Sequence, residues 1–291
     1  MQTILAETAG FCFGVDRAVA LVEQAVREGK RVATLGPIIH NRHVIERFKT
    51  LGVREIAAPE AAAAGECVVI RSHGVSRAVM EALEKMGVEI VDATCPFVKK
   101  IHRIISAAAE NGQQPVIIGT RAHPEVQAIA GWCSAPLVFE SPEEFASWLA
   151  DDAKRTEIPI RMVCQTTSTQ NLWKKTCEIA KKECTNCEIF DTICKATEMR
   201  QKEATTLAKQ CDAMVVVGDA RSSNTGRLAD ICRQYCKHVA LVDSAAELDM
   251  LLLSNAKTVG ITAGASTPAW IIKEVNNKMS EEMKVETAME E

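Results

Sequence analysis

Short apolar runs alternate with longer amphipathic stretches along most of the chain. Residues 67–74 (CVVIRSHG) form an apolar run that ends in a polar turn, as a buried strand would, and residues 76–87 follow with the apolar spacing of a helix. The same order recurs over residues 88–125. Alternation of strand and helix predicts parallel β-sheets with right-handed crossovers, which bind ligands beyond the carboxyl ends of their strands. Functional residues are therefore expected in the turns that follow the strands.

Three kinds of turn each occur three times. The first kind ends in a cysteine: Cys12 in ETAGFC, Cys95 in DATC and Cys194 in DTIC, the last two 99 residues apart. We group the turns of VVIRSHG, VIIGTRAHPE and MVVVGDARSSNTG as the second kind, and those of VATLGPIIHN, IRMVCQTTST and TVGITAGAST as the third. A repeat of this length predicts three similar α/β domains with small, mostly parallel sheets in a pseudo-threefold arrangement around a common centre.

The repeat also predicts domain bounds. We expect a first α/β domain over 13–95, a second over 96–191, and a third over 192–278 that includes residues 1–12. Residues 279–291 are rich in charged side chains and are expected to form a solvated, partly frayed tail.

Composition narrows the class of protein. The 291 residues are 47% hydrophobic and 25% charged, which suits a globular protein with a large core. A net charge of -4 and an aromatic content of 4% predict no nucleic-acid partner. No apolar run approaches the roughly 18 residues of a membrane span, and the first residues lack the pattern of a signal peptide. These features predict a cytoplasmic protein with no membrane partner, in which the 12 cysteines are not disulfides.

Three cysteines from three strand ends can converge on one metal centre. Three thiolates leave one iron of a four-iron cluster open as a Lewis acid, and catalytic zinc sites likewise keep one position open. The alternative is that Cys12, Cys95 and Cys194 are ordinary buried residues. A competing group, Cys177, Cys184, Cys187 and Cys194, has the spacing of a zinc knuckle or a redox dithiol, but a strand of roughly 17 Å separates Cys194 from the others. The other cysteines are expected to be packing residues.

Histidines and hydroxyl side chains stand in the same turns. His40, His73 and His123 follow apolar strands, and Ser222, Ser223, Asn224 and Ser266 supply further donors. With backbone amides at helix starts, this set suits a diphosphate without lysine or arginine. The alternative for residues 222–224 is a helix N-cap in an ordinary turn.

Glu125 follows His123 with Pro124 fixing the backbone between them. A carboxylic acid sheltered from water keeps a raised pKa and can deliver a proton. The alternative is a glutamate in the first turn of a helix, where the helix dipole favours it anyway.

Together these motifs resemble a known family. The ordered series GFCxGVDRA, HN, SHG, DATCP, HPEV, QTT, SSN and AGAST, from about Thr8 to Pro268, is similar to the iron-sulfur enzyme family of 4-hydroxy-3-methylbut-2-enyl diphosphate reductase. This family catalyses the last step of the methylerythritol phosphate route to isoprenoids. Its members have three α/β domains around a central cluster, which is the architecture that the repeat suggests independently.

The resemblance implies a role for each candidate residue. Cys12, Cys95 and Cys194 would bind three irons of one 4Fe-4S cluster, whose fourth iron would take the allylic hydroxyl of the substrate. Glu125 matches the proton donor, and Thr166 matches a hydroxyl that positions the substrate oxygen and relays protons. The residues that match the diphosphate-binding set are His40, His73, His123, Ser222, Ser223, Asn224 and Ser266. Two electrons, from a donor such as ferredoxin or flavodoxin, and two protons would remove the hydroxyl as water and give isopentenyl and dimethylallyl diphosphates.

Two other classes of function remain open. A hydro-lyase would use the same open iron without net electron transfer, so a requirement for a reductant separates it from a reductase. A redox or metal sensor would use the CTNC group, so replacement of Cys184 and Cys187 by serine separates it from both enzymes.

Overall fold

The computed structural model describes residues 2–290, with side chains over residues 2–281. The chain divides into two compact units, which are considered separately. Unit 1 contains residues 2–15, 40–46 and 195–290 of the described chain, and unit 2 contains residues 16–39 and 47–194. No described helix is both long enough and apolar enough to span a membrane.

The first sheet lies in unit 2 and has the strand order β3-β2-β4-β5. Its strands are β2 (Arg31–Leu35), β3 (Arg54–Ile56), β4 (Glu66–Ile70) and β5 (Glu89–Asp92). The helices of this part of the chain are α1 (Phe13–Arg27), α2 (Arg42–Thr50) and α3 (Arg77–Met86), with a 3-10 turn at Pro59–Ala61. Ser76 caps α3 by accepting a hydrogen bond from Val79 N, and Gly87 ends this helix in the left-handed conformation. Leu83 of α3 packs on Val68 and Ile70 of the central strand β4.

The second sheet, also in unit 2, has the order β7-β6-β8-β9. Its strands are β6 (Gln114–Ile118), β7 (Leu137–Phe139), β8 (Ile160–Cys164) and β9 (Cys187–Ile189). Its helices are α4 (Pro96–Glu110), α5 (Pro124–Ala130), α6 (Pro142–Ala150) and α7 (Gln170–Glu183), with a 3-10 helix at Ala153–Glu157. Because side chains alternate along a strand, Ile117 packs with α4 and α5 while Ile118 packs with α6 and α7.

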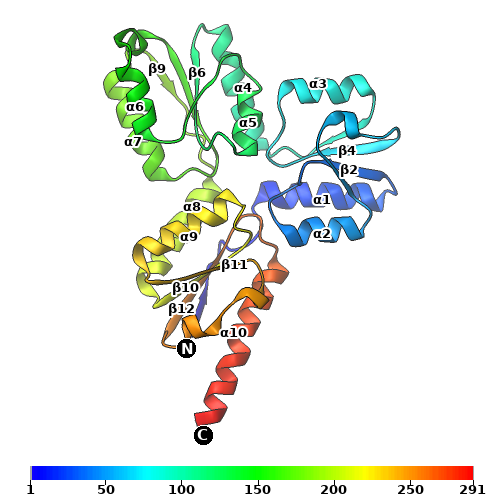
Figure 1. The fold of residues 1–291 in the computed structure, drawn as a ribbon, viewed down its shortest axis with the longest axis vertical. Coiled ribbons are helices and arrows are strands. Elements are labelled where there is room, and N and C mark those ends of the chain that lie inside the picture. The colour runs from blue at the N-terminus through cyan, green and yellow to red at the C-terminus, as the bar shows by residue number, and fades with distance from the viewer. Residues whose placement is uncertain (1, 291) are drawn as a thin grey trace. The chain divides into compact units, whose positions relative to one another are not determined.

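Unit 1 holds the third sheet, with the order β1-β12-β10-β11. Its strands are β1 (Gln2–Leu5), β10 (Ala213–Val217), β11 (His238–Val242) and β12 (Thr258–Ala263). Helices α8 (Lys195–Gln210) and α9 (Ser223–Tyr235) cover one face, and α10 (Ala269–Glu290) covers the other (Figure 1). Two 3-10 turns, Ala245–Glu247 and Met250–Leu253, follow β11. Met214 and Val216 of β10 face α8 and α9, whereas Val215 and Val217 face α10.

All three sheets have the same topology. Counted along each repeat, the spatial order is second, first, third and fourth strand, with the N-terminal strand β1 serving as the fourth strand of the third sheet. Every pairing among the described strands is parallel. The predicted fold class of three similar α/β domains is confirmed.

The structure corrects our grouping of the turns. The turn of VVIRSHG follows the third strand of its sheet, so it matches the turns after Cys164 and Ala263 rather than those after Ile118 and Val217. The turn of VATLGPIIHN follows the first strand, so it matches the turns after Ile118 and Val217 and belongs to the second kind. Both kinds of strand are central and buried, so their sequences are alike.

The C-terminal segment continues α10 as far as Glu290, and Met279 is buried against the third sheet. The backbone over 279–290 is therefore helical. Glu291 and the side chains of 282–290 lie outside the described part, so the solvated tail, like the predicted domain bounds, stays a prediction.

Candidate active site

The three candidate cysteines occupy equivalent places in the three sheets. Each follows the fourth strand, and each backbone N–H donates to a carbonyl oxygen two residues beyond the end of the third strand. The bonds run from Cys95 N to Ser72 O (3.0 Å), from Cys194 N to Thr166 O (3.0 Å), and from Cys12 N to Ala265 O (3.1 Å). The same backbone connection therefore holds all three cysteines beside the third-strand turn.

Each of these cysteines also stands directly before a helix. Cys12 precedes α1, Cys95 precedes α4 and Cys194 precedes α8, and all three side chains are partly buried. A helix N-terminus stabilises negative charge, so a thiolate bound to a metal group would suit each of these places. Three thiolate donors in matched positions fit the donor set of an iron-sulfur cluster.

Cys177, Cys184 and Cys187 have a different environment. Burial raises the pKa of Cys177 to about 11, and burial together with the neighbouring thiols raises the pKa of Cys187 to about 12. They pack against the core of the second sheet. Within residues 2–281 they belong to no group whose ligand atoms all lie within 4.8 Å of one another. Because no three ligand atoms that include one of these thiols converge within residues 2–281, these cysteines do not form the ligand set of a zinc site.

Unit 2 brings Glu125 and Thr166 together from two elements. Glu125 lies in the first turn of α5, and Thr166 follows β8. The two carboxylate oxygens accept hydrogen bonds from Thr166 N and Thr166 Oγ1, both at 2.6 Å. Glu125 is only 3% exposed, so this pair is almost fully removed from water.

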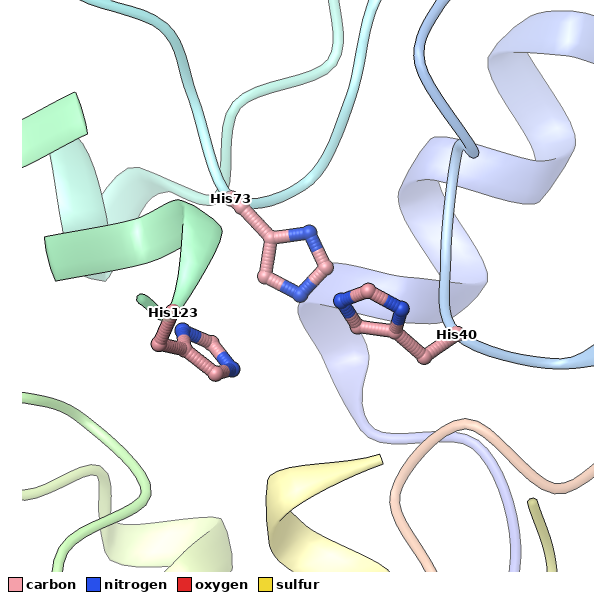
Figure 2. A group of neighbouring side chains, drawn as sticks. All are labelled: His40, His73 and His123. Carbon is pink, nitrogen blue, oxygen red and sulfur yellow. The ribbon is translucent and has the colours of Figure 1, made fainter. Parts of the chain in front are cut away.

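His123 and His73 lie beside this pair in unit 2. His123 is the N-cap residue of α5, and its Nδ1 accepts a hydrogen bond from Glu125 N at 3.2 Å. A neutral imidazole that accepts at Nδ1 carries its proton on Nε2, so His123 presents a donor there. Figure 2 shows His73 and His123 pointing toward each other, with ring centroids 5.4 Å apart in an edge-to-face arrangement.

Unit 1 gathers the remaining candidates. Ser222 caps α9, and Ser266 in the third-strand turn lies 3.3 Å from it, oxygen to oxygen. Ser266 Oγ also donates to the backbone oxygen of His40 at 3.0 Å. Asn224 accepts a hydrogen bond from Ala265 N at 3.0 Å, which leaves its buried Nδ2 without a partner among the described residues. Ser223 starts α9 beside them.

The sequence reasoning missed Gln165. This fully buried side chain accepts from Thr120 N at 3.0 Å and donates to Thr167 Oγ1 at 2.8 Å, so it joins the first-strand and third-strand turns of the second sheet. Its position directly before Thr166 in the QTT motif could have identified Gln165 from the sequence. Arg17 donates to the backbone oxygens of Asp92 and Thr94, beside Cys95.

The comparisons with known proteins agree with one another. The family model described as LytB protein matches residues 3–280. The chain is 40% identical over 283 residues to the 4-hydroxy-3-methylbut-2-enyl diphosphate reductase of Caldanaerobacter subterraneus subsp. tengcongensis, covering 96% of both chains. It is 38% identical over 281 residues to the reductase of the same name from Geobacter sulfurreducens, covering 97% of this chain and 98% of that one.

Two solved structures are also similar. A structure of (E)-4-hydroxy-3-methyl-but-2-enyl diphosphate reductase, described as the terminal enzyme of the non-mevalonate pathway, aligns with a TM-score of 0.70 at 37% identity, over 97% of this chain and 100% of that one. The E-1-hydroxy-2-methyl-but-2-enyl-4-diphosphate reductase from Plasmodium falciparum aligns with a TM-score of 0.88 at 25% identity, over 95% of this chain and 87% of that one. On the family match over nearly its whole length, together with these relatives, the chain belongs to the LytB protein family.

Proposed function

We propose that this protein is an iron-sulfur oxidoreductase that converts 4-hydroxy-3-methylbut-2-enyl diphosphate to isopentenyl and dimethylallyl diphosphates. The reaction consumes two electrons and two protons, breaks the allylic C–O bond and releases water. The observation that carries the proposal is the identical backbone setting of Cys12, Cys95 and Cys194, one in each sheet. The names of the relatives supply the substrate.

The proposed cofactor is one 4Fe-4S cluster held by these three cysteines. When bound, such a cluster supplies electrons and one iron with an open position for the substrate oxygen. The chain's contribution is the placement of each thiolate at a helix N-terminus, where the partial positive charge offsets the charge of the sulfur. The electron donor, a ferredoxin or flavodoxin, and the cytoplasmic location stay predictions.

The proposed diphosphate site uses neutral donors. The imidazoles are those of His40, His73 and His123, and the hydroxyl and amide groups are those of Ser222, Ser223, Asn224 and Ser266. Within unit 1, Ser222 and Ser266 are 5% and 6% exposed, so their hydroxyls are largely shielded from water. Helix N-termini at α5 and α9 add backbone N–H groups that suit phosphate oxygens.

Glu125 and Thr166 provide a route for a proton to the departing hydroxyl. In the protonated state the Glu125 carboxyl group can donate to Thr166 Oγ1, and the threonine hydroxyl then donates onward to the substrate oxygen. The 2.6 Å separation of the two oxygens suits such a transfer. Hydroxide is a poor leaving group, so a proton delivered as the C–O bond breaks lowers the barrier.

Anaerobic turnover tests the proposal. The protein reconstituted with iron and sulfide is mixed with reduced methyl viologen and 4-hydroxy-3-methylbut-2-enyl diphosphate, and viologen oxidation and products are followed. We expect substrate-dependent oxidation that yields both five-carbon diphosphates. Loss of water from the substrate without a reductant, giving a product other than these two diphosphates, would support a hydro-lyase instead. No oxidation by protein with confirmed iron and sulfide would refute the reductase.

A further inference from the structure

Unit 2 contains a cavity that does not include Glu125 or Thr166. It has a volume of about 570 Å³ and is bordered by α3, the end of β5, α4 and the loop after α5. Small-molecule sites typically enclose about 300–1,000 Å³, so a single ring with an anionic group would fit. None of the residues that line it is used by the proposed reaction.

Aromatic rings form one wall of this cavity. The indole of Trp132 and the imidazole of His102 stack with centroids 5.0 Å apart and an interplanar angle of 16°. The guanidinium group of Arg77 lies 5.3 Å from the centroid of the Trp132 ring. A flat ligand placed on this wall would gain ring stacking in addition to contact with a cation.

The charges around the cavity favour an anion. Lys99 is neutralised by Asp92, with Nζ and Oδ2 2.6 Å apart. Arg77 and Arg103 line the cavity and form no ion pair within the described part of the chain. Glu110 is the other acidic residue of the lining. Two unneutralised guanidinium groups against one carboxylate leave an excess of positive charge, which suits a carboxylate or phosphate.

His102 contributes its ring to the wall of the cavity. The residue is only 5% exposed and lines the cavity, and its Nε2 has no hydrogen-bond partner in the described part. Because this nitrogen is closed to water and lies against Gly74, His102 offers the cavity its ring rather than a hydrogen bond.

From these features we infer that the cavity is a binding site for a small phosphate or carboxylate with a flat, unsaturated ring. The ring stacks on Trp132, and the anionic group lies between Arg77 and Arg103. The inference does not depend on the proposed reductase activity.

The site is connected to the loop that carries His73. Trp132 Nε1 donates to Val75 O at 2.8 Å, and Arg77 N donates to Gly131 O at 3.3 Å. A ligand that packs on Trp132 and holds Arg77 stabilises both bonds. Binding should therefore slow amide hydrogen exchange of Arg77 and restrain the 72–77 turn.

Calorimetry with phenyl phosphate tests the site. The full-length protein is titrated in a buffer that contains no other phosphate. We expect phenyl phosphate to bind. Cyclohexyl phosphate should bind at least threefold more weakly because its ring is not flat, and inorganic phosphate should bind more weakly still. Equal affinity for phenyl and cyclohexyl phosphate would refute the inference, and the variants below test where phenyl phosphate binds.

Variants locate the binding. Arg77 and Arg103 have exposed side chains, so Arg77→Gln and Arg103→Gln should fold normally. Each is expected to weaken phenyl phosphate binding about threefold, and the double variant about tenfold, because partly exposed ion pairs contribute modestly. Arg233→Gln, on α9 in unit 1, is the matched control and should leave affinity unchanged. Unchanged affinity in the double variant, or no slowing of exchange at Arg77 on binding, would overturn the inference.

Discussion

Glu125 is a buried carboxyl group whose two oxygens each accept a hydrogen bond from Thr166. It follows a proline in the first turn of its helix, a place that many glutamates occupy for helix stability alone. Glu143 occupies the matching position in α6, also directly after a proline, but its side chain is exposed. A comparison of Glu125 with Glu143 can therefore distinguish a role in proton transfer from a role in stabilising the helix.

Glu125→Gln should lower turnover by about 100-fold or more, because the amide keeps the shape of the side chain but cannot deliver a proton. Pyrophosphate affinity should change less than about threefold, since the diphosphate donors are untouched. The measurements are anaerobic viologen oxidation and calorimetry. Glu143→Gln should retain normal turnover. Near-normal turnover of Glu125→Gln would remove Glu125 from the proton route.

His102 makes the stability of the protein depend on pH. Burial lowers its pKa from 6.5 to about 4, with Lys99 adding to the shift and Asp92 opposing it. Above pH 6.5 the imidazole is neutral in both states, so it contributes no pH dependence. Below that, the unfolded chain takes up a proton that the folded protein does not, and the free energy of unfolding falls until about pH 4.

Urea unfolding at pH 7, 6 and 5 measures this effect. Between pH 7 and pH 5 the wild-type protein should lose about 2 kcal/mol more stability than His102→Phe, which keeps a ring against Trp132 but has no titrating group. Parallel pH profiles for the two proteins would contradict the assignment of a neutral, buried imidazole.

At the scale of elements, a glycine follows the first strand of each sheet. The backbone N–H of each glycine donates to the carbonyl oxygen of the last residue of the second strand. The pairs are Gly36 with Ile56, Gly119 with Phe139, and Gly218 with Val242. Gly218 has a φ of +143°, and a Cβ atom there would overlap Thr267 Oγ1 and lie 2.9 Å from Thr225 Oγ1. The turn can approach the third-strand turn this closely only because the residue has no side chain.

Gly218→Ala should therefore lower the free energy of unfolding by about 2–4 kcal/mol, from backbone strain and from the clash. Gly226 lies eight residues later inside α9, with nothing within 4 Å of a Cβ atom. Gly226→Ala should stabilise by about 0.5–1 kcal/mol, because alanine favours the helix. Urea unfolding of both variants gives the comparison. A neutral Gly218→Ala would mean that the turn relaxes without cost.

These turns also show what the sequence could predict. The three cysteine turns were grouped correctly because a cysteine follows the fourth strand of every sheet. The other turns were partly misgrouped, because first and third strands are both buried apolar runs that end in small polar residues. The third strands end at Ile70, Cys164 and Ala263, 94 and 99 residues apart, so strict spacing would have placed VVIRSHG correctly. The hydrogen bonds of Gln165 with Thr120 and Thr167 depend on how the side chains are oriented, which the spacing of residues along the sequence does not predict.

At the scale of the whole molecule, the N-terminal strand completes the last sheet. β1 pairs with β12, which brings Cys12 beside Ala265 although more than 250 residues separate them along the chain. A ligand bound only by the folded protein stabilises every part that contributes to its site.

Loading the proposed cluster should therefore stabilise the folded protein. Calorimetry of the anaerobically reconstituted protein should give one unfolding transition, higher than that of the cluster-free protein by on the order of 5 °C, since a bound metal group adds to folding free energy. Cys12→Ser and Cys95→Ser, one in each unit, should each abolish the rise and most of the bound iron. Cys184→Ser should keep both, because Cys184 is a packed thiol whose pKa is raised by burial. If Cys12→Ser still shows the full iron-dependent rise in unfolding temperature, Cys12 is not a cluster ligand.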